Sequence, residues 1–600
     1  MAVKKGNPMH SNKATTKKPT IAKPLEANGK PTMIGARIIW ECLEREGVKT
    51  VFGYPGGAIL PAYDALQHSS IRHILVRHEQ GATHMADGYA RATGEVGVAI
   101  ATSGPGATNM VTGIATAMMD SSPIVCITGQ VGSKLLGSDA FQETDITGVT
   151  LPITKHNYLV TRADEIAPAI REAMYVAKSG RPGPVLIDIT KDAQQGSCEF
   201  DWEGAAPRMR GYRPDLSPAK EEYEKALHLI RAAKRPVILA GHGIEVSGAG
   251  SEVHAFAEKA CIPMAMTLLG LGALPASHFL NLGMMGMHGE AWVNTTIQEA
   301  DLLLAFGMRF DDRVTGNLKT YAPNAKKIHI DIDPAEINKN VRVDVALVGD
   351  LRKILQEMLP QLEPANRMEW IEHIRSLKGD TAVRDIQNLP DNGHLYAAHV
   401  INDLWNETRG RDTIIVTDVG QHQMWEAQYY KHENRRSLIT SGGLGTMGFA
   451  LPAAIGAKVA RPDADVWVVV GDGGFQMTMA ELATIVQENV KVNIAIINNG
   501  YLGMVRQWQE FFYERNYEAT PLLSPDFEKL GQAYGIRSVV IKKRADVIPA
   551  VRAAHAHEGP VLIDFKVEQE DTVYPMVAAG AALHEMIRRP NPLVETAEDE

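Results

Sequence analysis

Cysteine is scarce in this 600-residue chain, which contains four and has no C-x-x-C pair. This scarcity argues against a disulfide framework and against a cysteine zinc site. The pattern is typical of a protein from a reducing compartment, and we expect a cytoplasmic location. The four thiols, Cys42, Cys126, Cys198 and Cys261, are expected to be packing residues.

Long runs of one charge and long apolar segments are also lacking. The 61 Lys and Arg residues against 71 Asp and Glu residues give a formal net charge of −10, with no extended basic stripe. Nucleic acids and membranes are therefore poor candidate partners, and small molecules are favoured. The uncharged run between Glu95 and Asp120 contains SGPGATN and many small residues, so it does not predict a membrane-spanning helix.

The first thirty residues have seven lysines, no arginine and hardly any apolar periodicity. We expect residues 1–30 to be a disordered leader. A secretory signal needs an apolar core and a transit peptide favours arginine, so neither is indicated, although an organellar leader stays open as an alternative. The acidic end, ETAEDE, is expected to be a solvated tail.

The remaining chain alternates short β-branched runs with helical stretches, and its length exceeds what one hydrophobic core usually supports. This alternation predicts an α/β fold of three consecutive doubly wound parallel-sheet domains. Segments rich in Gly, Pro and polar residues separate them. The expected boundaries are an N-terminal domain at 31–193, a linker at 194–218, a central domain at 219–362, a linker at 363–390, a C-terminal domain at 391–572 and a tail at 573–600.

One strand–helix–strand unit carries polar residues after both of its strands. VWVVV ends at Gly471 and is followed by Asp472, while VNIAIIN leads to Asn499. Because the carboxyl ends of parallel strands share one edge of a sheet, these side chains are expected to lie close together. A carboxylate and an amide oxygen suit Mg²⁺, whose other ligands are usually water and phosphate oxygens. Taken singly, each motif is a common turn; together they favour a metal that holds a diphosphate.

The glycines of the same turn are expected to bring backbone N–H groups against the phosphates. No G-x-x-x-x-G-K-[ST] sequence is present, which disfavours a nucleoside triphosphate. GDG, then 24 residues, then NN resembles the thiamine diphosphate motif. The resemblance implies a metal shell of Asp472, Asn499 and the Tyr501 carbonyl. It also implies cofactor contacts from Gly57, Gln421, His422, Gly473, Gly474 and Met477.

Thiamine chemistry also needs a carboxylic acid beside the aminopyrimidine ring, which helps to remove the C2 proton. Glu79, in RHEQGATHMADGYARATG, matches the family's activating acid; alone, it would be interpreted as a surface residue. In SGGLGTMGFALPAA, Met447 matches the apolar wedge that bends the cofactor, and the Gly445 carbonyl matches the acceptor of its amino group. Without the other motifs, this stretch is equally a glycine-rich loop before a packed helix.

A wider set of motifs spans residues 31–572 and is collinear with the catalytic subunits of the acetohydroxyacid synthase (acetolactate synthase) family. The resemblance is carried by FGYPGGAILP, RHEQGATHMADGYARATG, GSDAFQETD, GRPGPVLIDITKD, GMMGMHGEA, GMRFDDRVTGN, HIDIDP, VGQHQMW and NNGYLGMVRQW. It implies pyrimidine-binding, central FAD-type and diphosphate-binding domains. It also implies decarboxylation of pyruvate and condensation with a second pyruvate or 2-oxobutyrate, giving 2-acetolactate or 2-aceto-2-hydroxybutyrate for valine, leucine and isoleucine biosynthesis.

The resemblance also supplies the rest of the expected site. Arg313 matches the substrate arginine, which suits carboxylate recognition, and Trp508 matches the wall that favours the extra methylene of 2-oxobutyrate. Other residues expected in the catalytic channel are Phe141, Gln142, Lys155, Met287 and Met504. FAD is expected at Arg181, Arg309, Asp311, Asp331 and Asp350, although no G-x-G-x-x-G sequence stands in a strand-to-helix context.

Two local departures from the family pattern affect the expected substrate preference. GSK precedes LLGSDAFQ, and Glu290 and Trp292 stand where small residues are common. The alternatives on the same scaffold are a pyruvate oxidase, another 2-oxoacid decarboxylase, or a catabolic acetolactate synthase without FAD. A catalytically dead binding protein would usually lose Glu79, Asp472 or Asn499.

The resemblance finally bears on assembly. Glu79 and Asp472 belong to different domains but must reach one cofactor, and the family does this between two subunits. We therefore expect a homodimer or homotetramer with interfacial active sites. The family also pairs with a small regulatory subunit.

Overall fold

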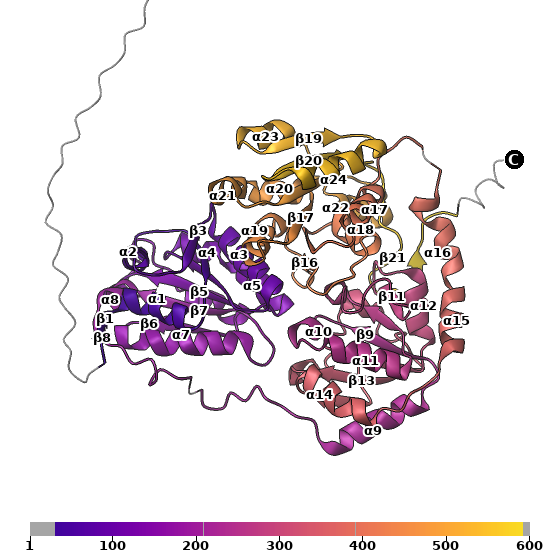
Figure 1. The fold of residues 1–600 in the computed structure, drawn as a ribbon, viewed down its shortest axis with the longest axis horizontal. Helices are drawn as coiled ribbons and strands as arrows, with labels where there is room; N and C mark the ends of the chain where they lie inside the picture. The colour runs from indigo at the N-terminus through magenta and orange to yellow at the C-terminus, as the bar shows by residue number, and fades with distance from the viewer. Residues whose placement is uncertain (1–29, 208, 391, 592–600) are drawn as a thin grey trace, which may run out of the picture.

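The computed structural model describes residues 30–207, 209–390 and 392–591. It contains three six-stranded parallel sheets that follow one another along the chain and carry helices on their faces (Figure 1). This confirms the predicted α/β fold of three parallel-sheet domains. The expected leader at 1–30 lies outside the described residues except for Lys30, and the ETAEDE end lies outside them entirely.

The first sheet has the order β3-β2-β4-β5-β7-β6. Its central strands are buried along their whole length, as a sheet covered on both faces requires. The strands are β2 (Thr50–Gly53), β3 (Arg72–Leu75), β4 (Gly97–Ala101), β5 (Ile124–Gln130), β6 (His156–Val160) and β7 (Val185–Thr190). The main helices are α1 (Gly35–Arg45), α2 (Leu60–Leu66), α3 (Glu79–Thr93), α5 (Val111–Asp120) and α7 (Ala163–Lys178).

The central sheet has a different order, β11-β10-β9-β12-β13-β14, in which the first strand lies in the middle and the order reverses beside it. This is the order of dinucleotide-binding sheets, whose ligands bind outside the carboxyl ends of the two middle strands. The strands are β9 (Pro236–Ala240), β10 (Met264–Met266), β11 (Asn281–Met284), β12 (Leu302–Phe306), β13 (Lys326–Asp331) and β14 (Val345–Val348). The main helices are α9 (Lys220–Ala232), α11 (Gly250–Ala260), α12 (Ala291–Glu299) and α14 (Leu351–Met358).

The third sheet, in the order β16-β15-β17-β18-β20-β19, repeats the topology of the first. Its order reverses between β15 and β17, so ligand-binding side chains are expected where these two strands end. The strands are β15 (Thr413–Thr417), β16 (Leu438–Thr440), β17 (Asp465–Gly471), β18 (Asn493–Asn498), β19 (Arg537–Ile541) and β20 (Val561–Lys566). The main helices are α17 (Ala397–Thr408), α18 (Gln421–Tyr429), α19 (Ala450–Ala460), α20 (Asp472–Thr478), α21 (Leu482–Glu488), α22 (Gly503–Phe512), α23 (Phe527–Ala533) and α24 (Val547–Ala556).

The first and third domains pack directly on each other through α3 and α19 (Figure 1). Two glycines permit a very close approach of the helices. A Cβ at Gly88 would lie 2.0 Å from the carbonyl oxygen of Ala453, and one at Gly456 would lie 1.9 Å from that of Met85. One hydrophobic cluster continues across this contact, with Ile114 and Phe449 among its buried members. The two domains therefore share a core.

Three segments between or after the domains also carry structure. Residues 197–199 form β8 (Ser197–Glu199), which pairs with β1 (Thr32–Ile34). The segment expected to link the central and third domains contains α15 (Met368–Ser376) and α16 (Lys378–Arg384). Beyond residue 572, β21 (Met576–Val577) pairs with β22 (Met586–Ile587), and Val577 and Leu583 are buried in a cluster of the central domain.

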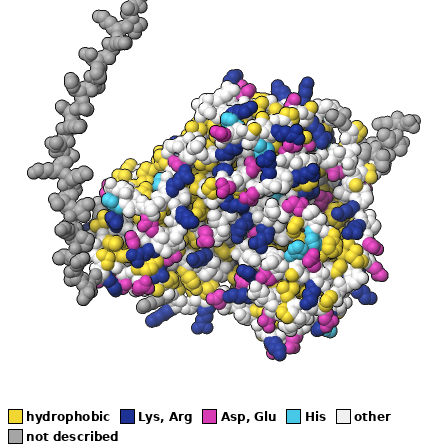
Figure 2. Space-filling view, in the orientation of Figure 1, with side chains coloured by type: hydrophobic (Ala, Val, Ile, Leu, Met, Phe, Trp, Pro, Cys, Tyr) yellow, Lys and Arg dark blue, Asp and Glu magenta, His cyan; other side chains and the backbone are white. Residues whose placement is uncertain are grey.

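The surface and the cysteines give two further observations. Basic and acidic side chains are interspersed on the face shown in Figure 2. Within the described ranges, no helix combines the length and the apolarity that a membrane crossing requires. Three of the cysteines are buried and Cys198 is half-buried, and none of the four forms a disulfide in the described part of the chain.

Candidate active site

The predicted diphosphate edge lies where β17 and β18 end. The two strands are parallel neighbours with Gly471 opposite Ile497, so Asp472 and Asn499 follow adjacent strand ends. Asp472 begins α20, whose first turn offers backbone N–H groups toward the same edge. The backbone therefore places Asp472 and Asn499 at neighbouring strand ends, as the sequence predicted.

The side chains at this edge are buried and only partly satisfied. Burial raises the pKa of Asp472 to about 6, although its Oδ2 accepts a hydrogen bond from the Ser524 hydroxyl at 2.8 Å. The amide of Asn499 donates to Gln421 at 3.2 Å, and its oxygen accepts from the Tyr501 N–H at 3.1 Å. The Nε2 atom of buried His422 has no hydrogen-bond partner among the described residues. His422 Nε2 is thus free to bind a ligand at this edge.

A loop of residues 441–449 brings Gly445 and Met447 to the same region. Asp418, directly after β15, accepts hydrogen bonds from the backbone N–H groups of Gly448 and Ala450, both at 3.0 Å. Burial raises the pKa of Asp418 to about 6. A Cβ at Gly473 would lie 3.5 Å from the Met447 methyl carbon and 2.8 Å from a Leu502 methyl carbon, so the turn is closely packed by side chains that include Met447.

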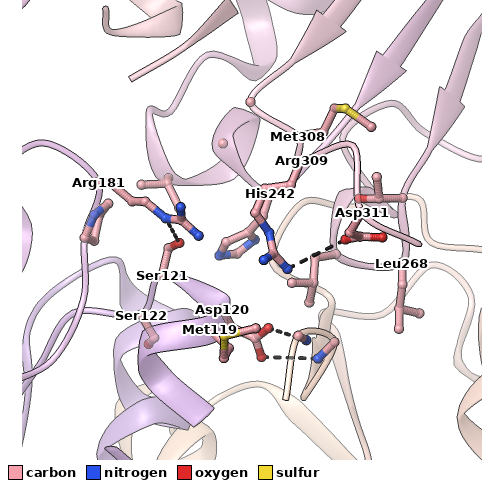
Figure 3. A pocket seen from close by; sticks show the side chains of 18 of the residues that line it. Met119, Asp120, Ser121, Ser122, Arg181, His242, Leu268, Met308, Arg309 and Asp311 are labelled. Atoms are coloured by element: carbon pink, nitrogen blue, oxygen red, sulfur yellow. Dashed lines mark hydrogen bonds and ion pairs between the residues drawn. The ribbon is translucent and has the colours of Figure 1, made fainter. Parts of the chain in front are cut away.

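A cavity of about 1080 Å³ lies between the three domains. Its walls include Gly243 and Gly307, which follow β9 and β12 at the reversal of the central sheet. Figure 3 shows Arg181 from the first domain and Arg309 from the central domain facing this space. Arg181 donates to Ser121 at 2.9 Å and to Glu336 at 2.8 Å, and thus links two domains across the cavity.

Burial shifts the pKa values of two side chains in the cavity. Burial raises the pKa of Asp311, opposed by Arg309 at 3.7 Å. Burial lowers the pKa of His242 to about 4, which keeps this ring neutral at physiological pH. The cavity therefore presents guanidinium groups and carboxylates beside a neutral imidazole, a surface with donors and acceptors for a polar ligand that has an aromatic part.

Eleven of the residues predicted from the sequence line this one cavity. Arg313 donates to the Met287 sulfur at 3.2 Å, and its side chain is 60% exposed. The residues expected to bind FAD, substrate or the bent cofactor that line it are Arg181, Arg309, Asp311, Asp331, Asp350, Met287, Arg313, Met504, Trp508, Gly445 and Met447.

A second cluster of predicted residues follows strands of the first sheet. Glu79 is the first residue of α3, and its Oε2 accepts from the Asn109 amide at 2.9 Å. Gln142 has a positive φ of 60°, and its backbone lies within 3 Å of a Cβ built at Gly104. Phe141 beside it is 89% exposed. This cluster does not line the cavity, nor do Gly57, Asp472, Gly473, Gly474, Met477, Asn499, Tyr501, Gln421 and His422.

Lys155 lies apart from both groups. Its ammonium donates to the Val176 carbonyl, to the Ser179 carbonyl at 2.6 Å and to the Tyr212 hydroxyl at 3.3 Å. These carbonyls belong to the carboxyl end of α7, where a cation is favoured. Burial lowers the pKa of Lys155 to about 8. In the single chain, Lys155 therefore caps a helix.

Several site residues were missed by sequence reasoning. Asp418 follows the strand TIIVT as Asp472 follows VWVVV, so the strand-end rule could have found it. Ser524 and Asp120 had no such signal, because Ser524 binds Asp472, 52 residues away, and Asp120 binds glycines of the loop more than 300 residues away in the sequence. The i, i+4 spacing of Asp87 and Arg91 on α3 could have indicated an ion pair, but not its contact with the third domain.

Comparisons with known proteins match the three-domain architecture. The chain matches the thiamine pyrophosphate enzyme N-terminal TPP binding domain at residues 33–149, the central domain at 223–358 and the C-terminal TPP binding domain at 418–565. It is 49% identical to the acetolactate synthase large subunit of Mycobacterium tuberculosis, over 92% of this chain and 91% of that protein.

Two other acetolactate synthases match the chain over a similar length. Identity is 49% to the acetolactate synthase large subunit of Corynebacterium glutamicum, over 92% of this chain and 89% of that one. Identity is 46% to the acetolactate synthase of Arthrospira platensis, over 91% of this chain and 96% of that one. By this similarity along nearly its whole length, the chain belongs to the acetolactate synthase large-subunit family of thiamine diphosphate (thiamine pyrophosphate) enzymes.

Proposed function

We propose that the protein is an acetolactate synthase that decarboxylates pyruvate on thiamine diphosphate. It then joins the remaining two-carbon unit to a second pyruvate or to 2-oxobutyrate, for valine, leucine and isoleucine biosynthesis. The observation that carries the proposal is the cavity, because Arg313 and Trp508 line the same space as Gly445 and Met447. A carboxylate-binding group and an apolar wall thus face the loop expected to bend the cofactor.

At the diphosphate end, Asp472, Asn499 and the Tyr501 carbonyl would hold Mg²⁺. The fit rests on the buried Asp472 carboxylate, whose pKa burial raises, and on its position at a strand end next to that of Asn499. The unpartnered Nε2 of His422 and the Gln421 amide would meet the diphosphate. The diphosphate site would be completed by Gly473, Gly474 and Met477.

At the reactive end, bound thiamine diphosphate supplies a carbon nucleophile and an electron sink. Glu79 of one chain would hold a proton at the pyrimidine ring, while the Gly445 carbonyl of another would accept from the amino group. The Met447 side chain, close to the turn at Gly473, would fill the space under the cofactor. Gln142 and Phe141 would close the channel from the side of Glu79.

The acceptor 2-oxoacid would bind at the wall formed by Met287, Arg313, Met504 and Trp508. Arg313 offers a planar fork to the substrate carboxylate, and its exposed side chain is free to turn toward it. Trp508 and Met504 offer apolar surface to the alkyl group of 2-oxobutyrate. One methylene adds about 1–3 kcal/mol of discrimination, so the preference for 2-oxobutyrate should be moderate.

The remaining space in the cavity would take FAD. Arg181 and Arg309 suit its diphosphate, and Asp311, Asp331 and Asp350 offer acceptors for ribityl and ribose hydroxyls. The cavity stands at the strand reversal of the central sheet, the usual position of a dinucleotide. Flavin content after purification tests this assignment and would separate the protein from a flavin-free acetolactate synthase.

Glu79 begins α3 of the first domain and Asp472 begins α20 of the third, yet both would act on one cofactor, which supports a homodimer or homotetramer with active sites between subunits. Phe141 beside one half-site and Leu523 near the other are 89% and 100% exposed, as expected for surfaces that another copy covers. The relatives' description as large subunits supports pairing with a small regulatory subunit. We also place the enzyme in the cytoplasm.

Complementation tests the interfacial site sharply. Glu79→Gln and Asp472→Ala chains should each be inactive alone. After mixing and reassembly, half of the dimers pair the two variants and contain one intact site of two, so about a quarter of wild-type activity should return. No recovery despite exchanged subunits would place Glu79 and Asp472 of one chain in the same site.

Product analysis tests the reaction itself. The purified chain is incubated with pyruvate, thiamine diphosphate, Mg²⁺ and FAD, with and without 2-oxobutyrate. Acetolactate, joined by acetohydroxybutyrate when 2-oxobutyrate is added, supports the proposal. Acetaldehyde alone, or acetyl phosphate with peroxide when phosphate and oxygen are supplied, would refute it and indicate a decarboxylase or an oxidase on the same scaffold.

A further inference from the structure

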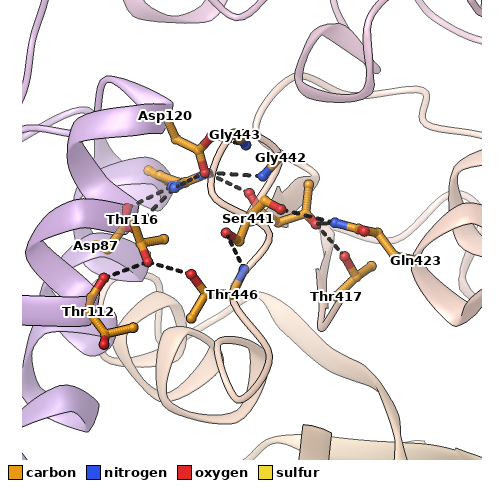
Figure 4. A network of polar contacts seen from close by, with 12 residues as sticks. Asp87, Thr112, Thr116, Asp120, Thr417, Gln423, Ser441, Gly442, Gly443 and Thr446 are labelled. Carbon is orange, nitrogen blue, oxygen red and sulfur yellow. Dashed lines mark hydrogen bonds and ion pairs between the residues drawn. The ribbon is translucent and has the colours of Figure 1, made fainter. Parts of the chain in front are cut away.

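The loop that carries Gly445 and Met447 is held from two sides. From its own domain, Asp418 binds the end of the loop at Gly448. From the first domain, Asp120 at the end of α5 accepts from the Gly443 N–H at 2.6 Å and from the Gly442 N–H at 3.2 Å. Figure 4 shows the two contacts of Asp120 with Gly442 and Gly443 spanning the domain boundary.

Two further contacts tie the same loop to the first domain. Arg91 on α3 donates to the Thr440 carbonyl at 2.7 Å, just before the loop begins. The hydroxyls of Thr116 on α5 and Thr446 are 2.7 Å apart, and the Thr446 N–H donates to Ser441 at 3.0 Å. The loop is therefore fixed at its start, at Gly442–Gly443 and directly before Met447.

Asp120 needs its hydrogen bonds to the loop because of the charges buried around it. Arg91 binds Asp87 through two bonds of 2.7 and 3.0 Å and binds Asp120 at 2.8 Å. All three side chains are buried: the Arg91 side chain is 5% exposed, and those of Asp87 and Asp120 are 0% exposed. One guanidinium faces two carboxylates, and burial raises the pKa of Asp120. The Gly442 and Gly443 N–H groups are thus the donors that complete the solvation of a buried carboxylate.

We propose that Asp120 is a positioning residue for the cofactor: its carboxylate, held by Arg91, fixes the Gly442–Gly443 backbone and thereby sets where Gly445 and Met447 stand. This inference rests on the proposed function, because it assigns those two residues to thiamine diphosphate. A displaced loop would leave Asp120 without its N–H donors, so the loop and the carboxylate stabilise each other's position. The reacting atoms are not touched by Asp120 itself.

Deuterium exchange at C2 of bound thiamine diphosphate reports this position directly, because the proton is lost faster than from the free cofactor only when the bent cofactor brings its amino group to C2. We expect Asp120→Asn to lower the exchange rate at saturating cofactor and Mg²⁺ by about tenfold or more, since misplacement by 1 Å can cost a factor of about a hundred. The melting temperature and the cofactor dissociation constant should change much less.

The matched control breaks a different contact between the same two domains. Arg72→Ala removes the ion pair of Arg72 with Glu488, which is 3.1 Å long and remote from the loop, and should leave the exchange rate unchanged. Thr116→Val, which keeps the shape but removes the hydroxyl contact with Thr446, should lower the rate less than Asp120→Asn does. Thr116→Val also tests the attachment of the loop to the first domain if Asp120→Asn does not fold.

Two results would overturn the proposal. One is an unchanged exchange rate in folded Asp120→Asn, or in Thr116→Val if Asp120→Asn does not fold. The other is an equal fall in Arg72→Ala, which would make the effect one of domain packing in general. Failure of the proposed function is distinguishable, because wild-type protein would then exchange the C2 proton no faster than free thiamine diphosphate.

Discussion

Replacing Gly88 by Ala should separate the first and third domains at one of the two close contacts between α3 and α19. The new Cβ would lie 2.0 Å from the Ala453 carbonyl oxygen, whereas carbon–oxygen contacts are normally about 3.3 Å or longer. The helices α3 and α19 must therefore move apart by roughly 1 Å, because the obstructing atom is backbone. Overpacking of this kind costs about 1–3 kcal/mol or more, and the better helix propensity of Ala returns about 1 kcal/mol.

We expect Gly88→Ala to be destabilising by about 2 kcal/mol, toward the upper end of that range after the propensity gain, since two helices and a shared core must shift. The assay is thermal unfolding at one scan rate, together with C2 exchange, because α3 begins at Glu79 and α19 follows Met447. Gly379→Ala in α16 is the matched control: its Cβ meets nothing within 4 Å, so it should be stabilising by about 0.5–1 kcal/mol. If both variants were stabilised equally, the reasoning from helix contact would be refuted.

The remaining predictions concern the site. Asp472→Ala should abolish Mg²⁺-dependent retention of thiamine diphosphate, measured by cofactor assay after dialysis; retention equal to wild type would remove Asp472 from the metal shell. Glu79→Gln should retain the cofactor but lose most C2 exchange, and unchanged exchange would contradict its role. Trp508→Ala should lower the preference for 2-oxobutyrate over pyruvate by about 10- to 200-fold at most, measured from product ratios in mixed substrates. An unaltered ratio would place the alkyl group elsewhere.

Much of the fold was predictable from the sequence because local signals and tertiary structure agree. VWVVV and VNIAIIN are continuous apolar runs, as strands covered on both faces of a parallel sheet must be, and both are strands. Asp472 and Asn499 could be placed at adjacent strand ends because the carboxyl ends of parallel strands share one edge of a sheet. Asp418, although it ends an equally clear strand, was missed because no paired motif drew attention to it.

Contacts between domains could not be predicted in this way. Arg91 and Thr440 are 349 residues apart, and nothing local indicates that one binds the carbonyl of the other. Lys155 binds the Ser179 carbonyl, 24 residues away at the end of α7, and no periodicity of the sequence records this contact. Assignments of function to individual residues, such as Glu79 or Arg309, came from family resemblance and remain predictions that the experiments above address.

The shared core of α3 and α19 has a consequence for synthesis of the chain. Ala82, Met85 and Ala86 on α3 are fully buried in a cluster whose other half includes Leu451 and Ile455. About 360 residues separate the end of α3 from the start of α19, which corresponds to roughly 20 to 70 s of translation at 5–20 residues per second. During that interval the first domain exposes an apolar helix face without its partner. A nascent chain halted in the central domain is therefore aggregation-prone and a candidate for chaperone binding.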